Sequence, residues 1–321
     1  MKHIFIVNPA AGKASTAEIL KEELSRVGEG YDWEIYETQA PEDATLFVKK
    51  TCTENPDTVY RFYACGGDGT ISEVVTGAIG FANASVGCYP CGSGNDFVKV
   101  YGGTERFLDV KALMDAEEET IDAIRVGDRY SLNITNFGFD TTVAKTIQKV
   151  RRKKILGGKR AYTTGVVTAI FTAMRNKCTV EADGEVINPK GKMLLCTVAN
   201  GEYVGGSFHC APRANVKDGL LEVCLFHPVN IFRFLKLLPV YTEGKHLDDE
   251  KTQKIMEYRR VKSVHVTAPE GFAYSLDGEI VYSSDFVCEV VPAAVRFAVP
   301  PMPAKKTESN EEAAQAEKAT V

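Results

Sequence analysis

The sequence predicts an α/β nucleotide-binding domain followed by a β-rich, sandwich-like second domain. Over the first third of the chain, short apolar runs alternate with helical patterns, which is typical of a parallel sheet covered by helices on both faces. Glycine-containing turns follow three of these apolar runs. Near residue 120 the strand-like segments become longer, and fewer helices separate them. With 321 residues, 44% of them hydrophobic, the chain is long enough to bury a core in each domain.

Helix and strand signals give the order of elements expected in the first domain. Ile19, Leu20 and Leu24 recur at helical spacing, and Pro41 opens the next helical pattern. The apolar run that begins at Ile4 ends at Asn8-Pro9, which is typical of a buried strand running into a turn. The expected strands are residues 4–7, 33–36, 61–65 and 86–89, and the expected helices are residues 14–26, 41–52 and 70–79.

The second domain is expected to span residues 123–291, after a first domain of residues 1–122. The chain from Ala304 onward is rich in Ala, Glu and Lys and lacks large apolar side chains, so residues 304–321 are expected to form a disordered tail. The expected strands are residues 123–126, 130–137, 179–182, 193–199, 220–226, 261–268 and 286–291, and the expected helices are residues 141–150, 162–175 and 229–241.

The loop of residues 66–70, Gly-Gly-Asp-Gly-Thr, is the strongest functional signal in the chain. Its glycines allow the backbone to approach a ligand closely, and its N–H groups can bind phosphate oxygens at the start of the following helix. Asp68 would repel a bare phosphate, so its presence favours a divalent cation between the carboxylate and the phosphates. The loop therefore predicts a nucleotide together with Mg²⁺.

Two further loops follow neighbouring strands. Residues 8–13 read Asn-Pro-Ala-Ala-Gly-Lys, and residues 91–97 read Cys-Gly-Ser-Gly-Asn-Asp-Phe. Taken singly, the first is better explained as a tight turn, and a helix cap explains the second equally well. The carboxyl ends of parallel strands share one edge of a sheet, so three such loops together indicate one nucleotide cleft. The spacing of a Walker loop is absent.

Two Asp-Gly pairs in the second domain are candidate hairpin turns. One is Asp218-Gly219, and the other is Asp277-Gly278, which Glu279 follows. A carboxylate just past a hairpin apex could reach a cleft between the domains. Glu279 is therefore the candidate general base for phosphoryl transfer to an alcohol. The five histidines show no metal-binding or catalytic spacing.

Charge and cysteine content bound the partners and the compartment. The formal net charge of −5 argues against a nucleic-acid-binding protein. Residues 149–160 form the most basic run, which is either a solvated loop or a contact with an anionic membrane. The nine cysteines are an odd number, and no secretory leader is visible, which favours reduced thiols in the cytoplasm. No segment has the continuous apolar length of a membrane-spanning helix.

Together, these motifs resemble the diacylglycerol kinase catalytic-domain family, specifically its bacterial lipid kinases. The resemblance covers roughly residues 2–300 and rests on the order and spacing of many short motifs. These are the segments 8–12, 66–70, 92–97, 136–140 (Asn-x-Gly-x-Asp), 200–206, 211–212, 218–221 and 277–279. It implies a two-domain ATP-dependent kinase with its active site in the interdomain cleft and a last strand, about residues 292–303, that returns to the first domain.

The resemblance also implies roles for individual residues. Glu279 matches the general base, and Asp68, Asp96 and Asp122 match carboxylates that organise a catalytic Mg²⁺ through water. Asp218, with the main-chain carbonyls of Asn215 and Leu220, matches a structural Mg²⁺ site. The expected ATP contacts are Asn8, Pro9, Ala10, Ala11, Gly12, Thr38, Gly66, Gly67, Asp68, Gly69, Thr70, Ser93 and Asn95.

The acceptor is the main open question. Diacylglycerol is the first expectation; phosphatidylglycerol, sphingoid bases, ceramide and undecaprenol-like alcohols remain alternatives. An NAD kinase shares the Gly-Gly-Asp-Gly loop but is disfavoured by the segments at 8–12 and 211–221. A non-catalytic lipid or nucleotide sensor is a rival from another class. The resemblance further implies a cytoplasmic protein that works at the inner face of the membrane on a lipid substrate, with a homodimer plausible.

Overall fold

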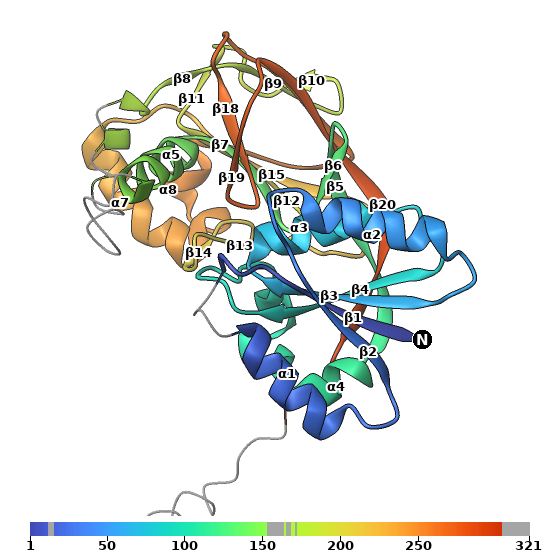
Figure 1. Ribbon diagram of the computed structural model, residues 1–321. Helices are drawn as coiled ribbons and strands as arrows, with labels where there is room; N and C mark the ends of the chain where they lie inside the picture. The colour runs from blue at the N-terminus through green and yellow to red at the C-terminus, as the bar shows by residue number, and fades with distance from the viewer. Residues whose placement is uncertain (12–15, 153–163, 165–167, 171, 304–321) are drawn as a thin grey trace, which may run out of the picture.

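The computed structural model describes residues 1–11, 16–152, 164, 168–170 and 172–303. It contains two domains, and a parallel sheet forms the centre of the first (Figure 1). The strands run in the order β2-β1-β3-β4, with every pair parallel. They are β1 (Lys2–Val7), β2 (Asp32–Glu37), β3 (Tyr60–Gly66) and β4 (Ala84–Pro90).

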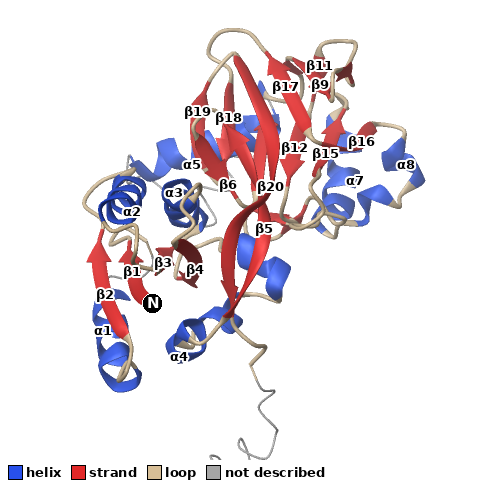
Figure 2. Ribbon diagram, turned by 90° about the vertical axis from the view of Figure 1, so that its right-hand side faces the viewer, coloured by secondary structure: helices blue, strands red, loops and turns tan. Residues whose placement is uncertain are grey.

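Helices cover both faces of this sheet, as Figures 1 and 2 show. Helices α2 and α3 pack together on one face, and α1 and α4 on the other. Phe5, Phe62 and Tyr63 are fully buried between the layers, which is why these strands are apolar along their whole length. The elements are α1 (Thr16–Val27), α2 (Asp43–Glu54), α3 (Asp68–Ala78), α4 (Val110–Met114) and the 3₁₀ helices η1 (Phe97–Tyr101) and η2 (Thr104–Phe107).

The second domain is a sandwich of two antiparallel layers. One layer is the six-stranded sheet β16-β15-β12-β7-β18-β19, and the other contains β10-β9-β17-β20 with β5 and β6. Side chains such as Phe137, Val223, Val264 and Phe286 meet between the layers. The strands of the first layer are β7 (Ile134–Gly138), β12 (Leu195–Ala199), β15 (Leu221–Phe226), β16 (Met256–Val261), β18 (Ala273–Leu276) and β19 (Glu279–Tyr282).

Strands of the second layer join the two domains. Strand β20 pairs with β17 and β5, then runs on past a bulge between Val291 and Val295 until Phe297 lies beside Val86 of β4. The last strand thus enters the parallel sheet of the first domain. The remaining strands are β5 (Glu117–Val126), β6 (Arg129–Ser131), β8 (Asn176–Lys177), β9 (Thr179–Ala182), β10 (Glu185–Val186), β11 (Lys192–Met193), β13 (Tyr203–Val204), β14 (Phe208–His209), β17 (Ser263–Thr267) and β20 (Asp285–Val299).

Helices pack on the outer face of the six-stranded sheet. Phe139 and Phe234 stack obliquely, with ring centroids 4.6 Å apart, and join helices α5 and α7 over that face. The elements are α5 (Phe139–Arg152), α7 (Ile231–Thr242), η3 (Lys245–Leu247) and α8 (Glu250–Gln253). The helix expected at 162–175 lies only partly among the described residues, where residues 164, 168–170 and 172 are helical. Most of the basic run at 149–160 and the tail of residues 304–321 lie outside the described residues.

The strand expected at 130–137 is wrong in one respect, because the structure divides it into β6 and β7 of different layers. Leu132 packs into the core of the first domain, whereas Ile134 packs under the helices of the second. The chain bends between them, and the hydroxyl of Ser131 accepts the N–H of Asn133 at 3.1 Å. The strand expected at 261–268 likewise begins after a break at Lys262, which separates β16 from β17.

Candidate active site

The glycine loops after β3 and β4 pack against each other. A Cβ atom on Gly92 would lie 2.5 Å from the Cα of Gly67, and one on Gly66 would lie 2.2 Å from the Thr70 hydroxyl. The N–H groups of Cys91 and Gly92 both donate to the carbonyl of Gly66, at 3.0 and 3.1 Å. Glycine is therefore required here by close backbone contact, as well as by any ligand that approaches the loop.

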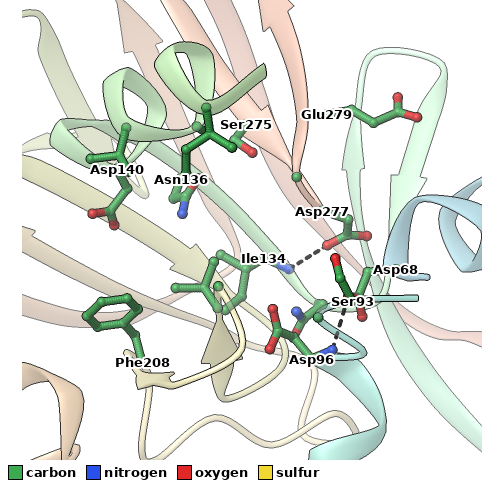
Figure 3. A pocket seen from close by; sticks show the side chains of 18 of the residues that line it. Asp68, Ser93, Asp96, Ile134, Asn136, Asp140, Phe208, Ser275, Asp277 and Glu279 are labelled. Carbon is green, nitrogen blue, oxygen red and sulfur yellow. Dashed lines mark hydrogen bonds between the residues drawn. The ribbon is translucent and has the colours of Figure 1, made fainter. Parts of the chain in front are cut away.

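Asp68 fastens the two loops together. It is the first residue of α3, and its carboxylate accepts the N–H group of Asp96 at 3.0 Å (Figure 3). It also accepts the N–H group of Phe97 at 2.9 Å. Burial raises the pKa of Asp68, and these two N–H bonds act against that rise. Asp68 therefore serves the geometry of the cleft before any ligand is bound.

Asp96 connects the two domains. Its carboxylate accepts the N–H of Gly206 at 2.9 Å and lies 2.5 Å from the ammonium group of Lys99. Lys99 in turn donates to the carbonyl of Gly206 at 2.8 Å. Gly206 belongs to the tight turn between β13 and β14 of the second domain and has a φ of +81°, which favours glycine. The turn of one domain is thus held against the loop of the other.

The hairpin β18–β19 brings two carboxylates to the same cleft. Asp277, at its turn, accepts the N–H of Ile134 at 2.9 Å, and burial raises its pKa to about 8 (Figure 3). Glu279, at the start of β19, lies 3.0 Å from the guanidinium of Arg129 through its Oε2 atom. A Cβ on Gly69 would lie 3.5 Å from the other oxygen of Glu279. Glu279 therefore presents one carboxylate oxygen to the glycine loop.

Arg129 carries a second ion pair. Its guanidinium binds Glu42 at 2.6 Å as well as Glu279, and it is partly buried between them. Glu42 directly precedes α2 of the first domain, so the chain Glu42–Arg129–Glu279 links the first domain to the hairpin of the second. No sequence motif predicted this role for Arg129.

The glycine loops and the β18–β19 hairpin border one cavity of about 620 Å³ with two chemically distinct ends. Gly67, Asp68, Ser93 and Asp96 lie at the polar end, with Asp277 and Glu279 beside them (Figure 3). The other end lies under α5 and α7 and is apolar. Its lining includes Phe139, Val143, Ala144, Ile147, Val204, Phe208, Phe234 and Leu238.

Asp140 is a carboxylate at the apolar end. It lies in the first turn of α5, and its Oδ2 atom is buried without a hydrogen-bond partner among the described residues. Burial raises its pKa to about 6. The residue belongs to the Asn-x-Gly-x-Asp segment at 136–140, but the pattern alone assigned it no task.

Other expected nucleotide contacts gather at the ends of β1 and β2. The amide of Asn8 donates to the Thr70 hydroxyl at 3.2 Å, and the Asn8 side-chain oxygen accepts the N–H of Ala10 at 2.9 Å. Thr38 follows β2, and its N–H donates to the carbonyl of Val7 at 2.9 Å.

Another expected nucleotide contact, Asn95, lies in the loop after β4. It adopts a φ of +49°, and its side chain donates to the carbonyl of Gly92. Gly12 and Lys13 lie outside the described residues.

Asp122 does not join the carboxylates of the cleft. Its side chain is buried and accepts the N–H groups of Gly219 at 2.7 Å and Ala293 at 2.8 Å, where β5, β15 and β20 meet. Asp122 therefore satisfies the backbone at the junction of the domains, and it is not part of the cavity lining.

The residues expected to form a structural Mg²⁺ site contact other protein groups in the structure. Asp218 pairs with Arg260 and accepts the N–H of Leu220 at 3.0 Å, and the side chain of Asn215 accepts the N–H of Lys217 at 3.0 Å. Within the part of the chain that the structure describes, no group of three or more His, Cys, Asp or Glu side chains is placed to hold a metal ion.

The carboxylates of Asp68 and Asp96 nevertheless fit a shared cation. A Cβ on Gly94 would lie 3.3 and 3.2 Å from one oxygen of each, so both oxygens face the same small space. Mg²⁺ is commonly held by one or two carboxylates together with water and substrate phosphates. The donor set at this end of the cavity therefore suits Mg²⁺ bound with a nucleotide.

Glycine loops at strand ends, a carboxylate beside them and an apolar chamber on the same cavity define the site of a kinase acting on a partly apolar alcohol. Comparison with known families agrees. The diacylglycerol kinase catalytic domain matches residues 2–126, and the YegS C-terminal NAD kinase beta sandwich-like domain matches residues 133–299. The chain belongs to this family of lipid kinases.

Relatives match over most of their length. The chain is 30% identical to a YegS-like lipid kinase of Klebsiella pneumoniae over 296 residues, which is 90% of this chain and 94% of the relative. It is 27% identical to a diacylglycerol kinase of Bacillus subtilis, covering 85% and 88% of the two chains. The crystal structure of a diacylglycerol kinase from Bacillus anthracis superposes with a TM-score of 0.69 at 24% identity, over 94% of this chain and 97% of that one, and supports the fold.

Proposed function

We propose that this lipid kinase transfers the γ-phosphoryl group of ATP to the hydroxyl of diacylglycerol and forms phosphatidic acid. The observation that carries the proposal is the continuity of the cavity, which runs from the glycine loops and Glu279 into the apolar chamber under α5 and α7. A lipid can lie with its acyl chains in the chamber and its hydroxyl at the polar end. NAD has no acyl chain that could fill such a chamber.

Each residue at the polar end has a task in this reaction. The loops at residues 8–12, 66–70 and 92–95 hold the phosphates through backbone N–H groups. Asp68 and Asp96 are the residues that would hold Mg²⁺, which offsets the charge that develops on the transferred group. Glu279 accepts the proton of the lipid hydroxyl as that oxygen attacks the phosphorus in line, and ADP leaves.

The test is phosphate transfer from radiolabelled ATP to a panel of lipids, with NAD as the polar competitor. The lipids are diacylglycerol, phosphatidylglycerol, a sphingoid base, ceramide and undecaprenol. We expect labelled phosphatidic acid to dominate. Label mainly in another lipid would correct the acceptor but keep the lipid kinase reaction. ATP binding without transfer to any of them would favour the sensor alternative.

Glu279→Gln tests the base. We expect nucleotide affinity to stay near that of the wild type, while kcat falls by about 10²–10⁴-fold, the usual contribution of general-base catalysis. Glu289→Gln is the matched control, because Glu289 also pairs with an arginine, Arg125, but does so at the protein surface. A Glu279→Gln enzyme with normal kcat would remove Glu279 from the role of base.

A further inference from the structure

Helix α7 exposes an apolar face that its own fold does not cover. Phe232 and Leu235 are 76% and 53% exposed, and Ile231 is 39% exposed. Phe232, Leu235 and Pro239 recur at positions that share one side of a helix, and all three are exposed. The opposite side buries Phe234, Leu237 and Tyr241 in the helical core, so α7 is fixed to the domain by one face only.

Basic side chains lie along one side of this apolar face. Arg233 and Lys236 on α7 line a groove of about 630 Å³ together with Lys251 and Lys254 of the following segment. Among the described residues, none of these four cations has a carboxylate within ion-pair distance. The acid in the groove is Asp249, whose carboxylate caps α8 by accepting the N–H and hydroxyl of Thr252.

Helix α7 also forms a wall of the apolar chamber. Phe234 and Leu238 of α7 line the cavity, next to Phe139 and Val143 of α5. Figures 1 and 2 both place α7 and α8 at the outer side of the second domain, away from the parallel sheet. One face of α7 thus borders the chamber, while another presents apolar and basic groups to the surroundings.

We propose that the outer face of α7, formed by Phe232 and Leu235 with the groove of Arg233, Lys236, Lys251 and Lys254 on one side of them, docks on an anionic membrane surface. Aromatic and aliphatic side chains enter the boundary between headgroups and acyl chains, and the cations meet lipid phosphates. The surplus of unpaired positive charge in a protein of net charge −5 favours an anionic bilayer over a protein partner. The inference rests on the proposed function for its purpose, since docking here brings the chamber to the lipid.

Binding to vesicles tests the surface without any use of kinase activity. The full-length protein is sedimented with vesicles of phosphatidylglycerol and phosphatidylcholine in equal parts, with no diacylglycerol present. We expect the double variant Phe232→Ser/Leu235→Ser to bind about tenfold more weakly than the wild type. Leu46→Ser is the matched control, because Leu46 on α2 is 65% exposed in the other domain, and it should bind as the wild type does.

The charge contribution is tested in the same assay. Lys236→Glu/Lys251→Glu should weaken binding by about tenfold or more on the anionic vesicles, and vesicles of phosphatidylcholine alone should bind all forms poorly. Lys50→Glu on α2 is the control. Wild-type binding by both double variants would overturn the proposal, whatever residues 149–160 contribute, because that run is intact in every protein compared.

Tryptophan fluorescence tests whether α7 inserts into the membrane. The chain has one tryptophan, Trp33, on β2 of the first domain, so Phe232→Trp adds a reporter at the proposed surface. Its emission should shift to shorter wavelength on anionic vesicles and be quenched by lipids brominated in their acyl chains. An unchanged spectrum would contradict insertion.

Kinase assays separate this proposal from the proposed function. With diacylglycerol dispersed in detergent micelles, the α7 variants should turn over as the wild type does, and with diacylglycerol in vesicles they should lose activity in proportion to binding. If the wild type phosphorylates no lipid but the variants still lose vesicle binding, the docking surface stands and the proposed reaction falls. If lipid phosphorylation occurs and the variants bind normally, the reverse holds.

Discussion

Replacing Asp140 by Asn should stabilise the protein at neutral pH. Asp140 lies in the first turn of α5, its Oδ2 atom is buried with no hydrogen-bond partner among the described residues, and burial raises the pKa of its carboxyl to about 6 from the ordinary 3.8. A carboxyl whose folded pKa lies above its unfolded value binds its proton more tightly in the folded state. The free energy of unfolding therefore falls as pH rises from about 4 to about 6, and stays lowered above that.

The size of the effect follows from the shift. A pKa difference of 6 − 3.8, about 2 units, corresponds to about 3 kcal/mol at full ionisation. Water in the cavity and the positive end of α5 both favour the charged form and reduce this value. We expect Asp140→Asn to gain about 1–3 kcal/mol above pH 6, since Asn keeps the shape and removes the charge.

Urea unfolding between pH 4 and pH 8 measures this directly. The difference between variant and wild type should be small near pH 4 and reach its full size by about pH 7. Asp249→Asn is the control: Asp249 caps α8, its hydrogen bonds to Thr252 lower its pKa, and its replacement should bring no gain at any of these pH values. A difference that does not change with pH, or an Asp140→Asn protein that is less stable at pH 7, would refute the reasoning.

Three further outcomes follow from the contacts of the cleft and the core. Arg129→Ala removes the ion pair that holds Glu279 and should lower kcat about tenfold with little change in KM for ATP. Arg125→Ala, on the neighbouring strand, should leave kcat unchanged. Equal kinetics of the two variants would contradict the positioning role of Arg129. Gly92→Ala places a Cβ 2.5 Å from Gly67 and should abolish nucleotide binding in calorimetry, an expectation that wild-type affinity would disprove. Glu118→Ala leaves the buried guanidinium of Arg61 without its counter-ion and should lower the free energy of unfolding in urea by about 3 kcal/mol. Glu117→Ala, at the neighbouring position, should lower it little. Similar losses in the two variants would show that the Arg61–Glu118 pair is unimportant for stability.

The sequence was informative where local rules decide the structure. Asp277-Gly278 does form the turn of a hairpin, and Glu279 does follow it at the cleft, because a tight turn with positive φ depends on the residues within it. The loops at 8–12, 66–70 and 91–97 follow the ends of three adjacent parallel strands, so the β3–β4 register and the β1–β3 register bring them to one edge. Both predictions depend on short-range patterns and on the geometry of parallel sheets.

The sequence was less informative where a side chain meets a partner distant in the chain. Asp122 and Asp218 were expected beside Mg²⁺. In the structure Asp122 accepts two backbone N–H groups and Asp218 pairs with a guanidinium, and the sequence predicted neither contact. Spacing along the chain contains no information on which of these groups will face a carboxylate. Arg129 was missed for the same reason, since Glu42 and Glu279 are far from it in sequence and meet it through the packing of two domains.

Several desolvated carboxylates destabilise the cleft at the junction of the two domains. The protein surroundings desolvate the carboxylates of Asp68 and Asp277 and raise their pKa values, and Asp96 is buried beside Asp68. Lys99 compensates only part of this charge, and it does so at the point where Asp96 holds Gly206 of the second domain. A cation that enters with phosphates would complete the compensation and bind both domains more firmly. The same carboxylates that weaken the cleft thus make the contact between its two halves depend on the ligand, which suits a kinase that must exclude water during phosphoryl transfer.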